Sequence, residues 1–234
     1  MIPILQKTKP LRKSDLSDAF VVLINKEETW TSFDVVNKLR YFLKIKKIGH
    51  AGTLDPFATG LLIIGVGKGT KALQEFSGLS KSYQAVIRFG VETDTLDRTG
   101  KIIAERAVTD LTFEKIENVI EDYKGEIEQL PPMYSAKKVN GKRMYKLARK
   151  NQEVERKPAK VTIHRADIIG WKSPVLKMDL KVSKGTYIRS YADDIGKKMG
   201  CGAHLQELKR TAIGTYKLED SYSLSEFMNY WTEH

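Results

Sequence analysis

The sequence has 234 residues, 41% of them hydrophobic, which suits a globular fold with a core and one large domain or two small ones. Lysine and arginine total 40 against 29 aspartate and glutamate, so the net charge of +11 favours a polyanionic partner, usually nucleic acid. The single cysteine, Cys201, excludes a disulfide framework within the chain and fits a reducing compartment. We expect a small buried thiol there rather than a nucleophile.

The apolar segments argue against a membrane-spanning or secreted protein. The longest apolar run, Leu61 to Val66, contains a glycine and is too short to cross a bilayer. The N-terminus has too few apolar residues for a secretory signal. We therefore expect a cytoplasmic protein without membrane contact.

The first third of the chain is predicted to contain one strand and two helices. Val21 to Ile24 is typical of a short buried strand. Thr31 with Asp34 three residues later approximates a capping box, with aspartate in place of the usual glutamate. The helix that follows is expected to place four apolar residues on one face: Phe33, Val36, Leu39 and Leu43. A second helix is expected from about Thr70 to Phe76.

The rest of the chain intermixes strands and helices without a regular βαβ period. Strands are predicted over four ranges: Tyr83 to Val91, Val161 to Ile169, Val175 to Val182 and Ala203 to Tyr216. A helix is predicted from Ser190 to Met199, and a short amphipathic tail extends from Leu224 to Trp231. Thr112 is expected to cap a further helix with five inward residues: Phe113, Ile116, Val119, Ile120 and Tyr123. This order favours an α+β fold over a doubly wound sheet.

One basic stretch interrupts the apolar periodicity between Leu130 and Pro158. From Lys137 to Arg165 there are eleven lysines or arginines against two acidic residues, with Tyr134 just before and Tyr145 inside. Basic groups that displace counterions from phosphate give sequence-independent affinity, and tyrosine rings can stack on unpaired bases. We expect an inserted arm that contacts RNA; the alternative is a solvated charged helix.

Several familiar site motifs are incomplete in this sequence. Gly65 to Thr70 resembles a phosphate-binding loop but lacks the required spacing, so a turn that caps a helix is the better interpretation. The acidic residues from Glu92 to Asp97 lack the alternation of a calcium loop, and Asp97 to Gly100 is typical of an ordinary turn. The four histidines show no zinc spacing. We expect no metal site and no cofactor.

The most distinctive run extends from Gly49 to Leu62 and reads Gly-His-Ala-Gly-Thr-Leu-Asp-Pro-Phe-Ala-Thr-Gly-Leu-Leu. Three glycines, a proline, a histidine and one aspartate, Asp55, come together just before an apolar strand. Composition alone indicates a tight loop, in which an aspartate before a proline is commonly structural.

This run resembles the catalytic motif of the TruB family of tRNA pseudouridine synthases, whose bacterial pattern is close to Gly-His-x-Gly-x-Leu-Asp-Pro-x-Ala-Thr-Gly-Leu-Leu. The likeness continues in the family's order from about residue 20 to residue 220. Further matching segments are Lys81-Ser82-Tyr83, Gln129 to Lys137, Gly185 to Ser190, Gly202 to Leu205 and Leu208-Lys209-Arg210.

The resemblance implies three catalytic residues. Asp55 corresponds to the family's catalytic aspartate, and Arg189 corresponds to the arginine that pairs with it. Tyr83 corresponds to the tyrosine that packs on the target base and is proposed to help move its C5 proton. Whether the aspartate attacks C1′ or removes a sugar proton to form a glycal stays open.

The resemblance also implies substrate-binding residues. His50 corresponds to the residue that fills the gap left by the flipped nucleotide, Tyr187 to a pocket tyrosine and Leu208 to an apolar wall of the base pocket. The family's RNA-gripping insertion corresponds to the basic stretch and supplies Lys137, Lys138, Lys142 and Arg143.

From the family we expect a pseudouridine synthase fold with a central mixed, mostly antiparallel sheet flanked by helices. Residues 1–234 are expected to form one catalytic domain with an insertion at 130–160, without the C-terminal PUA-type domain of many relatives. The implied reaction converts uridine-55 in the T-loop of tRNA to pseudouridine by base flipping, glycosidic bond cleavage and re-attachment through C5. A monomer that needs no guide RNA is expected.

One segment departs from the family pattern. The family has Lys-Pro-x-Gly-x-Thr-Ser, whereas Lys26 to Ser32 reads Lys-Glu-Glu-Thr-Trp-Thr-Ser. The proline and the glycine are missing, which leaves the geometry of this loop open.

Three other interpretations are open. The first is a non-catalytic RNA-binding protein that keeps the fold, and the second is a guide-dependent synthase of the dyskerin kind. The third is a nucleotide-dependent enzyme that uses the turn from Gly65 to Thr70. The combined presence of Asp55, Tyr83 and Arg189 favours catalysis over RNA binding alone. The bacterial form of the motif and the expected absence of the C-terminal domain disfavour the guide-dependent synthase.

Overall fold

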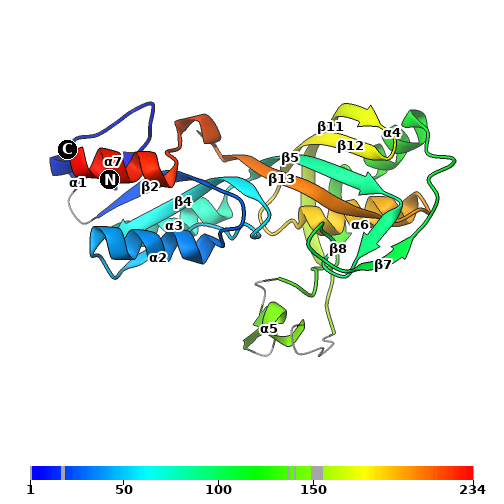
Figure 1. The fold of residues 1–234 in the computed structure, drawn as a ribbon, viewed down its shortest axis with the longest axis horizontal. Helices are drawn as coiled ribbons and strands as arrows, with labels where there is room; N and C mark the ends of the chain where they lie inside the picture. Colours follow the sequence, from blue (N-terminus) through cyan, green and yellow to red (C-terminus); the bar gives the residue numbers. More distant parts are fainter. Residues whose placement is uncertain (1, 17–18, 136–137, 140, 149–154, 234) are drawn as a thin grey trace. The chain divides into compact units, whose positions relative to one another are not determined.

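The computed structural model describes residues 2–16, 19–135, 138–139, 141–148 and 155–233 (Figure 1). The chain divides into two compact units. Unit 1 comprises Met1–Tyr83 and Lys209–His234, and unit 2 comprises Gln84–Leu208. Two long strands, β5 (Lys81–Phe89) and β13 (Ala203–Ile213), contribute residues to both units.

Unit 1 contains a mixed sheet in the order β1-β2-β4-β13, with β3 paired to β4 and β14 paired to β13. Its other strands are β1 (Ile4–Leu5), β2 (Ala19–Lys26), β3 (Ile48–His50), β4 (Thr59–Gly67) and β14 (Tyr216–Lys217). Its helices are α1 (Lys13–Leu16), α2 (Ser32–Leu43), α3 (Leu73–Gly78) and α7 (Leu224–Glu233), with 3-10 turns at η1 (Lys68–Ala72) and η2 (Leu218–Asp220). β2 runs antiparallel to β4, whereas β13 runs parallel to β4.

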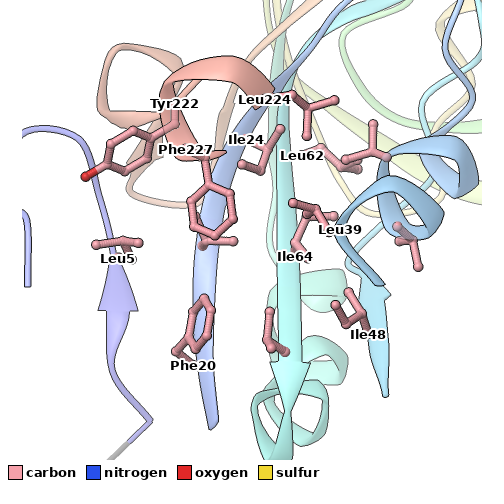
Figure 2. Close-up of a cluster of buried hydrophobic side chains, with 14 of the residues drawn as sticks. Leu5, Phe20, Ile24, Leu39, Ile48, Leu62, Ile64, Tyr222, Leu224 and Phe227 are labelled. Carbon is pink, nitrogen blue, oxygen red and sulfur yellow. The ribbon is translucent and has the colours of Figure 1, made fainter. Parts of the chain in front are cut away.

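The two middle strands of unit 1, β2 and β4, are buried on both faces, which explains their nearly continuous apolar sequence. On one face they pack against α2 and α7 through Phe20, Ile24, Leu39, Leu62, Ile64 and Phe227 (Figure 2). On the other face Leu23 and Ile63 pack with Phe76 of α3. The sheet therefore gives the loop between β3 and β4 a rigid support.

Unit 2 contains a sheet in the order β13-β5-β12-β11-β8. Its other strands are β8 (Gly125–Gln129), β11 (Ala159–Lys172) and β12 (Val175–Val182), and a separate antiparallel pair joins β6 (Val91–Thr93) and β7 (Ile102–Glu105). Two helices, α4 (Phe113–Asp122) and α6 (Ile188–Lys198), contact each other. The predicted α+β class with a mixed, mostly antiparallel sheet and flanking helices is confirmed.

Residues 130–158 connect β8 and β11, two strands that pair directly with Gln129 opposite Ala159. Within this connection β9 (Lys138–Val139) pairs antiparallel with β10 (Lys142–Arg143), and a short helix α5 (Met144–Ala148) follows. Nη1 of Arg156 donates to the carbonyl of Pro131 at 3.2 Å, which joins the beginning and the end of the connection.

The capping box predicted for α2 is confirmed. Oγ1 of Thr31 accepts from the backbone N–H of Asp34 at 3.0 Å, and Oδ2 of Asp34 accepts from the N–H of Thr31 at 2.8 Å. The predicted buried face is wrong for Phe33, whose side chain is 55% exposed and lies under the guanidinium of Arg40. Ser32 takes the inward position because its hydroxyl binds the backbone of Leu54.

Two further predictions need correction. Phe113, expected to face inward from α4, is exposed, while Ile116 and Ile120 form the buried side. The last long strand ends at Ile213 rather than Tyr216, because Gly214 has a positive φ of 57° and turns the chain into β14.

Candidate active site

Asp55 lies on the loop that joins β3 to β4 in unit 1. The two strands are antiparallel neighbours with His50 opposite Ile64, so the loop begins and ends at adjacent positions of the sheet. Inside the loop the backbone N–H of Ala58 donates to the carbonyl of Asp55 at 3.1 Å, which closes a tight turn. Asp55 and His50 are both half-buried.

Three side chains from three other elements hold this loop by its backbone. Ser32 of α2 binds Leu54 in both directions, since its Oγ accepts from the N–H at 2.8 Å and donates to the carbonyl at 3.2 Å. Nζ of Lys26, at the end of β2, donates to the carbonyls of Trp30 at 2.6 Å and of Pro56 at 3.4 Å.

The third side chain is Arg210 of β13, whose Nε donates to the carbonyl of Leu61 at 2.7 Å. Its Nη2 donates to the carbonyl of Gly52 at 3.2 Å. No sequence motif predicted a function for Lys26, Ser32 or Arg210. Lys26 and Arg210 were visible only as cations within motifs, and nothing local indicated that both are buried.

The pKa of Lys26 depends on its burial and on the charged groups around the loop. Burial lowers the pKa of Lys26 to about 8, and the negative charge of Asp55 opposes this shift while the positive charge of Arg210 adds to it. Asp55 and Arg210 therefore both act on the same buried ammonium. Two buried cations accompany the single carboxylate of this loop, which suits a site built around a negative charge.

The segment that departs from the family pattern keeps an unusual backbone conformation. Thr29 stands at the position of the family's glycine and has a φ of 72°, in the left-handed region that glycine adopts without strain. Its N–H donates to the carbonyl of Pro56 at 2.9 Å, directly after Asp55. The loop thus takes a glycine-like conformation although a β-branched residue occupies it.

Tyr83 lies on the buried side of β5, where exposed and buried residues alternate. Two residues earlier, Nζ of Lys81 donates to the carbonyls of Ser77 and Leu79, each at 2.7 Å, and so binds the C-terminal end of α3. Lys81 therefore anchors the start of β5 to the end of α3, two residues before Tyr83.

Arg189 is buried in unit 2, with only 3% of the residue exposed, in the first turn of α6. Its Nη1 donates to the carbonyl of Thr95 at 2.8 Å and its Nη2 to the carbonyl of Tyr134 at 2.7 Å. Its Nε lies 3.5 Å from Oδ2 of Asp97. Arg189 is therefore a buried arginine at the start of α6 and not a surface residue.

The predicted turn from Asp97 to Gly100 is confirmed, since the N–H of Gly100 donates to the carbonyl of Asp97 at 3.2 Å, but the side chain of Asp97 has a further role. The residue is 4% exposed, and its Oδ1 accepts hydrogen bonds from Oγ1 of Thr95 and from the N–H of Thr99, both at 2.9 Å. Its other oxygen faces Arg189. This role could not be predicted from the sequence, because the same turn residues occur whether a turn is exposed or binds a buried arginine.

The start of α6 is fixed by Gln129 at the end of β8. Tyr187, the residue before the helix, donates its N–H to Oε1 of Gln129 at 2.8 Å and accepts at its carbonyl from Nε2 at 3.0 Å. Oγ of Ser190 donates to the carbonyl of Leu130 at 3.0 Å. Tyr187 is half-buried, and Leu208 is buried on β13.

The predicted site residues are divided between the two units. His50, Asp55 and Tyr83 belong to unit 1, whereas Tyr187, Arg189 and Leu208 belong to unit 2. The pairing of Asp55 with Arg189 stays a prediction. Lys138, Lys142 and Arg143 lie on β9 and β10, and Lys137 lies outside the described residues.

Other predicted features have simple outcomes. Cys201 is a buried free thiol, as expected. Across the described ranges, no three histidine, cysteine, aspartate or glutamate side chains group in a way that could hold a metal ion. Within the same part of the chain, every helix is too short or too polar to cross a bilayer.

Two known protein families match successive parts of the chain from residue 40 onward. The N-terminal domain of TruB family pseudouridylate synthases matches residues 40–188, and the C-terminal domain of tRNA pseudouridylate synthase B matches residues 189–234.

Individual relatives agree with this result. A tRNA pseudouridine synthase B of Clostridium kluyveri is 47% identical over 207 residues, covering 87% of this chain and 70% of the relative. That of Solibacter usitatus is 44% identical over 206 residues, covering 88% and 70%.

A solved structure shows the same fold. A chain in the crystal structure of a Cbf5-Nop10-Gar1 complex superposes with a TM-score of 0.74 at 25% identity, covering 97% of this chain. This chain spans 58% of the length of that one. Together with the family matches, this likeness confirms the predicted pseudouridine synthase fold. The chain belongs to the TruB family of pseudouridylate synthases.

Proposed function

We propose that this protein converts uridine-55 in the T-loop of tRNA to pseudouridine without a guide RNA. The support is its family, its relatives named tRNA pseudouridine synthase B, and the order in which their motifs occur here. The observation that carries the proposal is the Asp55 loop, whose backbone is held on both sides of the aspartate by buried side chains. A carboxylate that must meet one sugar carbon needs such a support.

In the proposed reaction the bond between C1′ and N1 of uridine breaks and its electron pair leaves with the base. Asp55 acts on the sugar, either by bonding to C1′ or by removing a sugar proton. The base then turns and C5 bonds to C1′, while the bond from Asp55 to C1′ breaks in the first route or the sugar regains its proton in the second. The C5 proton leaves and N1 gains a proton. Atoms and electrons balance without an oxidant or a cofactor.

Each remaining residue has a position in this scheme. Arg189 pairs with Asp55, and its own orientation is set by Asp97 because the guanidinium plane must satisfy both the carboxylate and two carbonyls. Tyr83 packs on the base, beside the C5 proton, and Leu208 forms the opposite wall.

RNA binding uses different chemistry. The target base must leave its stack, which costs a few kcal/mol. His50 fills the vacated position, and the four basic residues of the insertion contact phosphates: Lys137, Lys138, Lys142 and Arg143. These contacts offset the cost of flipping.

The decisive experiment is pseudouridine mapping on an unmodified tRNA transcript incubated with the purified protein alone. We expect conversion at one T-loop uridine. The Asp55→Asn variant is expected to bind the transcript with nearly unchanged affinity and to form no product, because the amide can neither attack C1′ nor accept a proton. Conversion by this variant would remove Asp55 from the chemistry.

Asp110→Asn is the matched control, since Asp110 is an exposed aspartate of a connecting segment. It should convert the transcript at the wild-type rate. If the wild-type protein modifies RNA only when a guide RNA is added, the guide-dependent alternative holds instead.

A further inference from the structure

Arg210 is the largest of the fully buried side chains in the described part of the chain, and the reaction scheme above does not use it. Only 1% of the residue is exposed, and Leu61, the nearer in sequence of the two residues whose carbonyls accept from it, lies 149 residues away. A buried guanidinium is costly unless each donor is satisfied. The positions of its two carbonyl acceptors, Gly52 and Leu61, show which segment Arg210 holds.

The two acceptors stand on opposite sides of Asp55. The carbonyl of Gly52 comes three residues before the aspartate, and the carbonyl of Leu61 comes six residues after it. A planar guanidinium presents its N–H groups in a fixed arrangement, so the two carbonyls must keep one separation and one orientation. Arg210 thereby closes the base of the loop that carries Asp55.

The backbone of Arg210 adds a second link to the same loop. β13 pairs with the first residues of β4, with Arg210 opposite Gly60. A Cβ on Gly60 would lie 2.3 Å from the carbonyl oxygen of Arg210, and the φ of Gly60 is +106°. Only glycine permits this approach, so side chain and backbone of Arg210 both depend on the close contact between β13 and the loop.

The positive charge of Arg210 also acts on the surroundings of the Asp55 loop. It lowers the pKa of the buried Lys26 ammonium, on which the charge of Asp55 acts in the opposite direction. Arg210 and Lys26 thus hold the loop from two strands, through Gly52 and Leu61 in one case and Pro56 in the other.

We propose that Arg210 is a positioning residue for Asp55: its guanidinium clamps both limbs of the β3–β4 loop and so sets where the carboxylate meets the sugar. The proposal rests on the proposed role of Asp55. A clamp of this kind affects the chemical step more than tRNA binding, because the phosphate contacts lie elsewhere.

Arg210→Lys tests the clamp, since lysine keeps the charge but its flexible ammonium lacks the rigid planar fork that holds the two carbonyls in one relative orientation. We expect the single-turnover rate at saturating tRNA to fall about 100-fold, as a displacement near 1 Å commonly causes. The dissociation constant for tRNA should change by less than about threefold. Amide hydrogen exchange should accelerate from Gly52 to Leu61 and stay unchanged in α2 and α7.

Arg88→Lys is the matched control because Arg88 is exposed on β5, and it should change none of these quantities. A folded Arg210→Lys protein with the wild-type rate and the wild-type exchange would overturn the proposal. A rate loss accompanied by faster exchange throughout unit 1 would also overturn it, because that marks general destabilisation. If wild-type protein forms no pseudouridine, the proposed function fails, and the exchange measurement alone then decides whether Arg210 holds the loop.

Discussion

Thr29 carries backbone strain at the residue scale, at the position where the family motif has glycine. A β-branched side chain at a φ of 72° is disfavoured by contact between Cβ and the backbone. The conformation is kept because the N–H of Thr29 binds the carbonyl of Pro56, next to Asp55. The strain is thus tolerated in exchange for a fixed loop.

Thr29→Gly is expected to stabilise the protein. Relief of the left-handed strain outweighs the larger entropy of glycine in the unfolded chain, which leaves a gain of about 1 kcal/mol. The free energy of unfolding, measured by urea denaturation, should rise at an unchanged m value. Thr109→Gly, at an exposed position with ordinary φ, should lower it slightly. Equal effects of the two substitutions would contradict strain at Thr29.

At the element scale, the start of α6 depends on one amide. Gln129 satisfies both the N–H and the carbonyl of Tyr187, and Arg189 follows two residues later. The last residue of β8 therefore sets the position of the helix that presents the arginine. Asp97, from the connection between β6 and β7, then fixes the direction of the guanidinium.

Gln129→Leu is expected to lower the free energy of unfolding by about 1–3 kcal/mol, because it removes the side-chain oxygen that accepts from the N–H of Tyr187 and leaves the carbonyl of Tyr187 with the N–H of Tyr191. Urea denaturation measures the stability. The remaining folded protein should also convert tRNA more slowly, since Arg189 loses its support. Gln84→Leu, on the exposed side of β5, should be nearly neutral. A neutral Gln129→Leu would show that other contacts fix the helix start.

At the scale of the whole molecule, charge is distributed unevenly. The excess of 40 basic over 29 acidic residues makes the protein attractive to any polyanion, but the stretch from Lys137 to Arg165 holds eleven of the basic residues. A high local density of basic residues strengthens RNA binding, because each phosphate that a basic residue neutralises releases its own counterions.

Replacing Lys137, Lys138, Lys142 and Arg143 with alanine is expected to weaken tRNA binding and to flatten its salt dependence. Each lost phosphate contact changes the slope of log K against log salt by about 0.7–0.9. Filter binding between low and moderate salt measures the slope. The control removes four exposed lysines from other elements, Lys9, Lys101, Lys181 and Lys198, and should leave the slope nearly unchanged. An unchanged slope in the first variant would exclude the insertion from the RNA interface.

Sequence alone determined the family, the α+β class and most of the helices and strands. These features depend on local spacing: the run from Gly49 to Leu62, the capping box at Thr31 and the alternation along β5 each lie within a few consecutive residues. The amphipathic tail was also predictable from the sequence, because one side of α7 is apolar whatever element that side packs against. Such short-range patterns can be recognised without knowing which element packs against them.

Only the tertiary structure decided which groups support the reactive ones. Asp97 reads as a turn residue until Arg189, far along the chain, is found against it. Arg210 reads as one of many cations until its side chain reaches Leu61 and Gly52, and Phe33 reads as core until Ser32 turns α2 toward Leu54. Hydrogen bonds between residues so distant in sequence follow no local period, since they form only when folding brings buried donors to the acceptors that satisfy them.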